Sequence, residues 1–420
     1  MPPRRKPELM APAGNWTSLQ AAIQAGADAI YFGLRGFNMR DSSNNFSVAE
    51  LPRITRTCKQ AGVRAYLALN TIIYENELAR IRRIVAAAAA AAVDAVICWD
   101  MAVVQAATAL GLPVFLSTQM SVSNSASLAA FYRTFGIRRF VLARECSLAH
   151  IRSLRRNLST QLGTDAANIE IEVFAHGAMC VSLSGRCFMS ETAVGKSANR
   201  GQCTQPCRRP YQITSGEGDV AFRMGNTYLL SPQDLCTLPF IEQLIEAGVG
   251  SLKIEGRGRA PEYVSTVTAA YRRAVDFHFE NHRRPGFRQD FQNLKDTLMH
   301  QLEGVYHRGL ASGYYMGRPL DQWSDTPNSQ AANKKLHVGE VVKFYRKAGA
   351  VEIRVCDNGF ALGDELLIQG PITGVVRVPV TSIQIEHQAM PDAQRGQAVA
   401  VQLTSPVRPG DRVYRLCLRG

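Results

Sequence analysis

The chain has 420 residues, of which 46% are hydrophobic and 20% are charged, a composition typical of a globular protein with a buried core. No apolar run reaches the roughly 18 residues that cross a bilayer, and the basic N-terminus has no apolar segment behind it. We therefore expect no membrane span and no secretory signal, and we predict a cytoplasmic protein. The net charge of +13 favours a polyanionic partner such as a nucleic acid.

Eight short β-type runs recur along the first 256 residues, and most are separated by alanine-rich segments of helix length. The runs cover residues 9–14, 29–33, 64–70, 95–100, 114–119, 139–145, 169–177 and 251–256. Strands that alternate with helices pair in parallel, and eight such units close into a barrel. We therefore predict a TIM-type (β/α)8 barrel. An open doubly wound sheet is the alternative, but residues 13–16 lack the glycine fingerprint of such sheets.

The spacing changes after the seventh run and again after the eighth. We assign residues 1–320 to the barrel, with a cysteine-rich loop at 177–240 inserted after the seventh strand, and residues 321–336 to a polar linker. Residues 337–420 contain short alternating runs with Gly-Asp pairs at turns, which predicts a small antiparallel β-barrel. This pattern is similar to the second domain of translation elongation factors, and the similarity implies a role in RNA docking.

Polar residues end most of the predicted strands, and barrel enzymes carry their chemistry at the carboxyl ends of the strands. The candidates taken as a set are Asn70, Asp100, Gln119, Arg144, Glu145, His176, Lys253 and Glu255. For each residue alone, capping a helix or ordering a loop explains the position equally well. Lys253 and Glu255 share one face of a strand, so they form either an anion-binding and proton-donating pair or a salt-bridged strand end.

Five of the ten cysteines cluster in the long connection after the seventh strand: Cys180, Cys187, Cys203, Cys207 and Cys236. In the cytoplasm such a cluster indicates metal or redox chemistry rather than disulfides. Thiolates bind iron–sulfur clusters and structural zinc. Zinc sites usually contain closely spaced pairs of cysteines, whereas six residues separate Cys180 from Cys187. We favour an iron–sulfur cluster and keep zinc as the alternative. Four ligands suffice, so one cysteine is spare or has another role.

These segments resemble the signature of the collagenase-like peptidase family U32. The resemblance covers nearly the whole chain, and its cysteine-bearing motifs are specific. The matching segments are residues 9–14, 172–180, 184–187 with Ser190, 199–208, 230–236 and 251–257.

The resemblance implies an activity other than the one in the family's name, because better understood members are similar to oxygen-independent hydroxylases that carry a [4Fe-4S] cluster. Chain length, the trailing β-region and the basic charge favour the branch that forms 5-hydroxyuridine at the wobble position of tRNA, with prephenate as the hydroxyl donor. Hydroxylation of a ribosomal RNA cytidine or of the ubiquinone ring is an alternative. A peptidase is another, although no Ser-His-Asp arrangement, His-Glu-x-x-His motif or nucleophile elbow is visible.

The resemblance also implies ligands by motif position, namely Cys180, Cys187, Cys203 and Cys236, with Cys207 as the alternative. We expect a carboxylate-bearing donor to bind cationic side chains, with two amides as further substrate contacts. These residues are Lys253, Arg257, Arg144, Asn70 and Gln119.

For proton transfer the candidates are Glu145, His176 and Glu255. The expected partner is the anticodon region of tRNA, with the target base out of its stack. The sequence leaves a homo-oligomer open.

Overall fold

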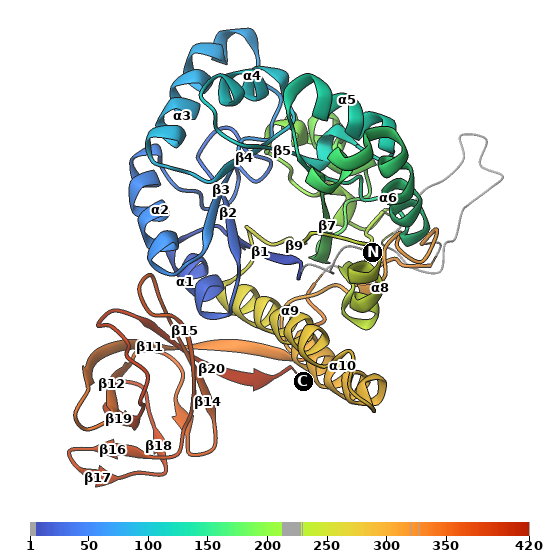
Figure 1. The fold of residues 1–420 in the computed structure, drawn as a ribbon. Helices are drawn as coiled ribbons and strands as arrows, with labels where there is room; N and C mark the ends of the chain where they lie inside the picture. The colour runs from blue at the N-terminus through green and yellow to red at the C-terminus, as the bar shows by residue number, and fades with distance from the viewer. Residues whose placement is uncertain (1–5, 212–227, 229, 320, 327, 420) are drawn as a thin grey trace, which may run out of the picture.

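Parallel strands close into a barrel in the computed structural model, which describes residues 6–211, 228, 230–319, 321–326 and 328–419 (Figure 1). Within these ranges, eight strands form the ring, because β9 pairs with both β7 and β1. This arrangement confirms the predicted (β/α)8 barrel. Its strands are β1 (Glu8–Ala13), β2 (Ala29–Gly33), β3 (Arg64–Ala68), β4 (Ala95–Cys98), β5 (Val114–Leu116), β6 (Arg139–Val141), β7 (Glu170–Gly177) and β9 (Ser251–Ile254).

Helices surround the barrel and turn apolar stripes toward it (Figure 1). In α3, for example, Ile81, Ile84 and Ala88 recur on one face and are buried. Asp100, one of the predicted rim residues, caps α4 by accepting a hydrogen bond from the Ala102 amide at 2.9 Å. The helices are α1 (Trp16–Gln24), α2 (Leu51–Gln60), α3 (Leu78–Ala90), α4 (Met101–Ala109), α5 (Ser125–Phe135), α6 (Leu148–Leu162), α8 (Ile241–Glu246), α9 (Pro261–Asn281) and α10 (Phe287–Glu303). In the described part of the chain, none of the helices has both the length and the apolar character that crossing a bilayer requires.

Several strands end earlier than the sequence predicted. β5 ends at Leu116 because Thr118–Met120 forms a 3-10 helix, η3, and β6 ends at Val141. Asn70, Gln119, Arg144 and Glu145 therefore lie in the loops that follow the strands. These loops form the carboxyl-end rim of the barrel, where the predicted site was placed.

The C-terminal region forms a curled antiparallel sheet, as predicted, with its own apolar core around Val338, Ile353 and Val399. Within the described residues, the order of its eight strands is β15-β14-β20-β11-β12-β19-β16-β17. β11 begins at Asn333, inside the segment that the sequence suggested as a linker. The strands are β11 (Asn333–Tyr345), β12 (Ala350–Val355), β14 (Glu365–Gly370), β15 (Gly374–Pro379), β16 (Ile383–Ile385), β17 (Gln388–Ala389), β19 (Ala398–Gln402) and β20 (Arg412–Leu418), while β13 (Phe360–Ala361) pairs with β18 (Asp392–Ala393).

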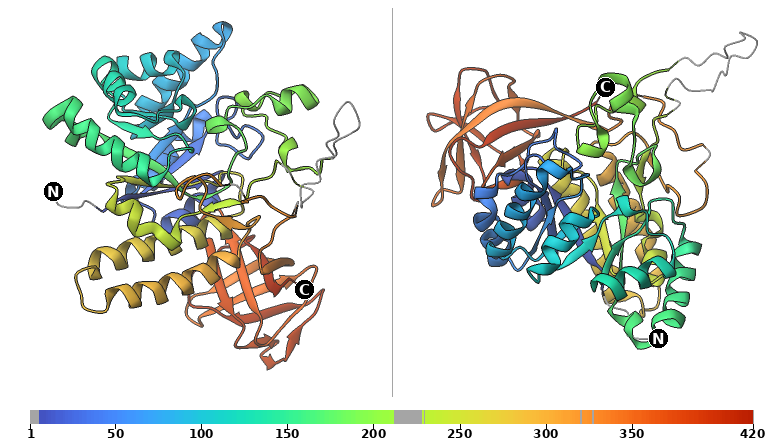
Figure 2. Two further views of the ribbon diagram at one scale, coloured as in Figure 1. Left: turned by 90° about the vertical axis from the view of Figure 1, so that its right-hand side faces the viewer. Right: turned by 90° about the horizontal axis from the view of Figure 1, so that it is seen from above.

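Two helices hold this sheet against the barrel. In α1, the Gln24 amide donates to the Thr373 carbonyl at 2.7 Å and accepts from the Val375 amide at 3.2 Å. At the start of α9, Glu262 forms an ion pair with Lys335 at 2.9 Å. Gly374 has a φ of +70°, and a Cβ there would lie 2.2 Å from Gln24 Oε1, so the junction requires glycine. Both views in Figure 2 place the sheet on the side of the barrel where the cysteine-rich segment projects.

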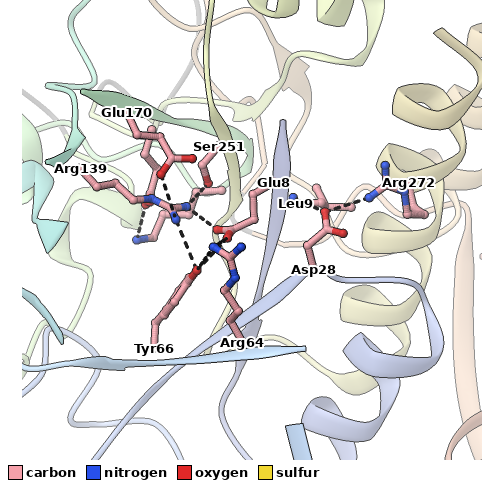
Figure 3. A network of polar contacts seen from close by, with 11 residues as sticks. Glu8, Leu9, Asp28, Arg64, Tyr66, Arg139, Glu170, Ser251 and Arg272 are labelled. Atoms are coloured by element: carbon pink, nitrogen blue, oxygen red, sulfur yellow. Dashed lines mark hydrogen bonds and ion pairs between the residues drawn. The ribbon is translucent and has the colours of Figure 1, made fainter. Parts of the chain in front are cut away.

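A buried ionic network crosses the barrel interior. The guanidinium of Arg139, which is 1% exposed, contacts Glu8 at 2.5 Å, Ser251 and Tyr66 at the amino end of the barrel (Figure 3). Its Nε also donates to Glu172 Oε2 at 2.8 Å, and the other oxygen of Glu172 accepts from Lys253 Nζ at 3.0 Å. The network therefore links β1, β6, β7 and β9 through charged groups.

Replacing Glu172 with alanine should lower the free energy of unfolding by about 3–5 kcal/mol, because Arg139 and Lys253 would lose their shared buried carboxylate. Urea unfolding followed by circular dichroism measures the loss. Glu340→Ala is the control, because Glu340 forms only an exposed ion pair, with Arg354 at 3.4 Å. That variant should lose at most about 1 kcal/mol, so equal losses in the two variants would contradict the account.

Candidate active site

The rim of the barrel and the cysteine-rich segment enclose a cavity. The empty space of the cavity, including its opening to solvent, has a volume of about 940 Å³, within the usual range for small-molecule sites. Its cover comes from residues 180–207, which include α7 (Met189–Val194) and the 3-10 helices η5 (Leu183–Gly185), η6 (Ala198–Arg200) and η7 (Pro206–Arg208). Its floor is formed by barrel residues Tyr31, Ala68, Ile97, Val141, Phe174 and Lys253.

Four cysteines of the cover line this cavity together: Cys180, Cys187, Cys203 and Cys207. Hydrogen-bond donors surround their sulfur atoms. The Met189 amide donates to Cys187 Sγ and the Gln205 amide to Cys203 Sγ, each at 3.4 Å. Burial raises the pKa of Cys207 to about 11, and the nearby thiols of the other three cysteines add to the increase. Donors directed at sulfur stabilise a thiolate ligand set.

Cys236, which the sequence analysis included in the ligand set, is not brought to the cavity. It lies in β8 (Asp234–Cys236), opposite His176 in an antiparallel pairing with β7. Its buried Sγ is 3.8 Å from the Tyr271 hydroxyl and 3.7 Å from Met299 Sδ. Burial raises the pKa of this thiol to about 11. The structure thus groups Cys207 with the other three cysteines and leaves Cys236 in the wall between β7 and α9.

Glu145 holds the cover in place. Its carboxylate accepts hydrogen bonds from the Ser184 amide at 2.7 Å and from the Ser184 hydroxyl at 2.8 Å. Ser184 is buried and has a left-handed φ of +46°, so these bonds fix a strained turn between two of the cysteines. This geometry favours the loop-ordering alternative for Glu145 over proton transfer.

Glu255 lines the cavity but is already paired. Its Oε1 lies 2.9 Å from Arg40 Nη2. Burial alone would raise the pKa of Glu255, but the guanidiniums of Arg40, Arg259 and Arg144 outweigh it and lower the pKa to about 2. A carboxylate of such low pKa is a weak base at neutral pH. The geometry therefore favours the salt-bridged alternative for Glu255.

Arg40 was missed by the sequence analysis. It lies seven residues beyond the end of β2, whereas the predicted rim residues lie at or just after the strand ends. The loop after β2 lies at the same rim as the loops after the other strands. The sequence could have suggested Arg40 as a site residue only through this position after a strand.

Arg144, Lys253 and Arg257, the cations predicted to bind a carboxylate donor, all line the cavity. Lys253 is neutralised by Glu172, whereas no carboxylate among the described residues forms an ion pair with Arg144 or Arg257. Arg257 is 5% exposed, and its Nη1 has no hydrogen-bond partner in the described structure. Burial lowers the pKa of Arg257 to about 10, so the side chain remains cationic at neutral pH. A buried, unpaired guanidinium favours an anionic ligand.

The remaining predicted residues divide between the cavity and the wall behind it. Asn70 and Gln119 line the cavity and contact each other, with Asn70 Nδ2 3.4 Å from Gln119 Oε1. His176 does not line it, because its ring packs between Tyr263 and Tyr271. Burial lowers the pKa of His176 to about 4.

Residues 14–325 match the model of peptidase family U32. The chain belongs to this family. A U32 relative from Porphyromonas gingivalis named collagenase is 38% identical over 97% of both chains. The tRNA hydroxylation protein P1 of Bacillus subtilis is 31% identical, with 87% of this chain and 84% of the relative covered. The 23S rRNA 5-hydroxycytidine C2501 synthase of Escherichia coli is 34% identical, with 80% of this chain and 49% of the relative covered.

Stability should fall as His176 is protonated. Its pKa is about 4 in the folded protein against an ordinary 6.5, so the unfolded chain binds more protons between these values. The stabilisation is complete above pH 6.5 and is lost as the pH falls through 4, by up to about 3 kcal/mol. Unfolding free energies at pH 7 and 4.5 should therefore differ less in His176→Asn than in the wild type. An unchanged difference would show that another group causes the loss.

Proposed function

We propose that this protein is an iron–sulfur enzyme that hydroxylates an RNA base without molecular oxygen, forming 5-hydroxyuridine at the wobble position of tRNA. The observation that carries the proposal is the convergence of four thiols on a cavity with an unpaired, buried arginine. The names of the tRNA and ribosomal RNA relatives and the net charge of +13 support an RNA substrate. The name of the ribosomal RNA relative specifies a cytidine, so a cytidine is the nearest alternative.

The donor set fits a [4Fe-4S] cluster, for which four cysteine thiolates are the normal ligands. Within the described residues, no group of three or more His, Cys, Asp or Glu side chains is arranged to hold a single metal ion. All four thiols line one cavity, as the ligands of a single cluster must. Cys180, Cys187, Cys203 and Cys207 would hold it, and it would supply one-electron chemistry at the cavity.

Prephenate, the proposed hydroxyl donor, carries two carboxylates, and the cavity offers cations to match. Arg257 and Arg144 present guanidiniums that no described carboxylate neutralises, and such groups bind carboxylates in bidentate fashion. Lys253 adds an ammonium group whose position Glu172 fixes at 3.0 Å. Asn70 and Gln119 add hydrogen-bonding amides to the lining of the same cavity. These residues would bind and orient the donor beside the thiols.

A peptidase is the second candidate, and the 38% identity to the P. gingivalis collagenase favours it. The site offers it little support. His176 is buried outside the cavity, and the described residues hold no group for the metal ion of a metallopeptidase.

Nucleoside analysis of tRNA tests the function. By mass spectrometry, tRNA from a deletion strain should lack 5-hydroxyuridine and its derivatives, and the wild-type gene should restore them. A gene that encodes Arg257→Met should restore little, because the donor loses its unpaired cation. An unchanged nucleoside profile in the deletion strain would overturn the proposal. Turnover of gelatin by the anaerobically purified protein, abolished by Arg257→Met, would favour the peptidase instead.

Two cysteine variants test the ligand set. Cys207→Ser should lose most of the iron and sulfide found in anaerobically purified wild-type protein, because it removes one of four ligands. Cys236→Ser is the matched control and should retain them, because Cys236 Sγ contacts Tyr271 and Met299 instead of the cavity. The opposite result, with loss of iron only in Cys236→Ser, would refute the assignment.

A further inference from the structure

The cavity continues beyond the cysteines. A second hollow shares part of its wall, including Arg40, Glu255 and three of the four thiols. A third hollow lies between the barrel and the C-terminal sheet, and it shares Gly258 and Arg259 with the second. The three hollows therefore adjoin in series. We call the second and third together the junction groove, which runs from the cysteine-rich segment to β11, β15 and β20.

The junction groove is cationic. Eight Lys and Arg side chains line it, against the two carboxylates of Glu255 and Glu262. Two carboxylates outside the lining also form ion pairs with groove residues. Asp234 pairs with Arg308 at 2.9 Å, and Glu365 pairs with Arg377 at 3.1 Å. These four carboxylates balance only half of the positive charge. The eight cations are Arg40, Arg208, Arg259, Arg308, Lys334, Lys335, Arg377 and Arg419.

Two exposed cations of the groove lie at the C-terminal sheet. Lys334 and Arg419 are exposed, and no carboxylate among the described residues pairs with either. Arg419 instead donates to the carbonyl of Ser329 at 2.5 Å. Exposed cations along a groove between two structural units are suited to the phosphates of a polyanion, because such contacts neutralise charge along an extended backbone.

An aromatic platform stands where the second and third hollows meet. The Arg259 guanidinium lies 3.7 Å from the centroid of the Tyr306 ring, and Tyr306 is only half-buried. Proteins that bind single-stranded nucleic acid combine such stacking surfaces with a cationic groove that follows the backbone. A duplex would offer no free base face to this platform.

We infer that the junction groove binds the sugar–phosphate backbone of a single-stranded RNA segment and leads its target base into the cysteine-lined cavity. Lys334 and Arg419 contact phosphates, and the Arg259–Tyr306 pair stacks on a base next to the target. The inference rests on the proposed function, because it takes RNA as the substrate. It identifies the surface for the RNA docking expected of the C-terminal region, because the C-terminal sheet supplies one wall of the track.

Binding of a fluorescent anticodon stem-loop, measured by anisotropy over a series of NaCl concentrations, tests the groove. Lys334→Glu/Arg419→Glu should weaken binding about tenfold at physiological salt and lower the salt slope by about two, one for each phosphate that the variant no longer neutralises. Arg346→Glu/Lys347→Glu is the matched control, with the same charge change on the exposed turn between β11 and β12. It should stay within about twofold of the wild type.

A third variant separates stacking from charge. Tyr306→Ala should weaken binding roughly fivefold or more while leaving the salt slope unchanged. Iron content and melting temperature equal to the wild type would show that each variant is folded.

The outcomes distinguish the two hypotheses. Wild-type protein that binds no RNA would contradict the proposed function. Tight wild-type binding with the same affinity and slope in Lys334→Glu/Arg419→Glu would overturn the groove and leave the proposed function standing. Equal weakening by the control pair would also overturn it, since only overall charge would then matter.

Discussion

Glu172 is fully buried inside the barrel, with one carboxylate oxygen toward Arg139 and the other toward Lys253. A buried carboxylate is stable only when charged partners replace its lost water, so both contacts constrain the strands that carry them. Arg139 extends the network to Glu8 at the amino end, and Lys253 extends it to the floor of the cavity. The same interaction therefore holds the ring closed through β7, β9 and β1. It also fixes the position of a cation, Lys253, in the candidate site.

Around the cavity, as in the barrel interior, carboxylates hold other groups in place. Glu255 fixes Arg40, and Glu145 fixes the turn at Ser184 between two of the thiols. Arg257 and Arg144 are left without a carboxylate among the described residues. An anionic ligand would complete the charge balance of the site. Because the acids near the cavity are already engaged, the proposed chemistry depends on bound groups more than on side chains that carry protons.

The sequence predicted the features that repeat. Eight β-type runs separated by helices were enough for the barrel, and alternating short runs were enough for the C-terminal sheet. Strand ends were less predictable, because the predicted run 114–119 includes polar residues that form a 3-10 helix from Thr118 instead of extending the strand. The site itself depends on long-range contacts. Nothing in the spacing of the cysteines indicates that β8 turns Cys236 toward Tyr271, or that a loop after β2 brings Arg40 to Glu255.

We propose that four thiols at the mouth of this U32 barrel hold an iron–sulfur cluster beside an anion-binding cavity. Iron and acid-labile sulfide should be quantified in the wild-type protein purified without oxygen, together with its absorbance and electron paramagnetic resonance spectra. We expect about four irons and about four sulfides per chain, with a signal that appears or disappears on one-electron reduction. One zinc per chain with no sulfide would refute the cluster.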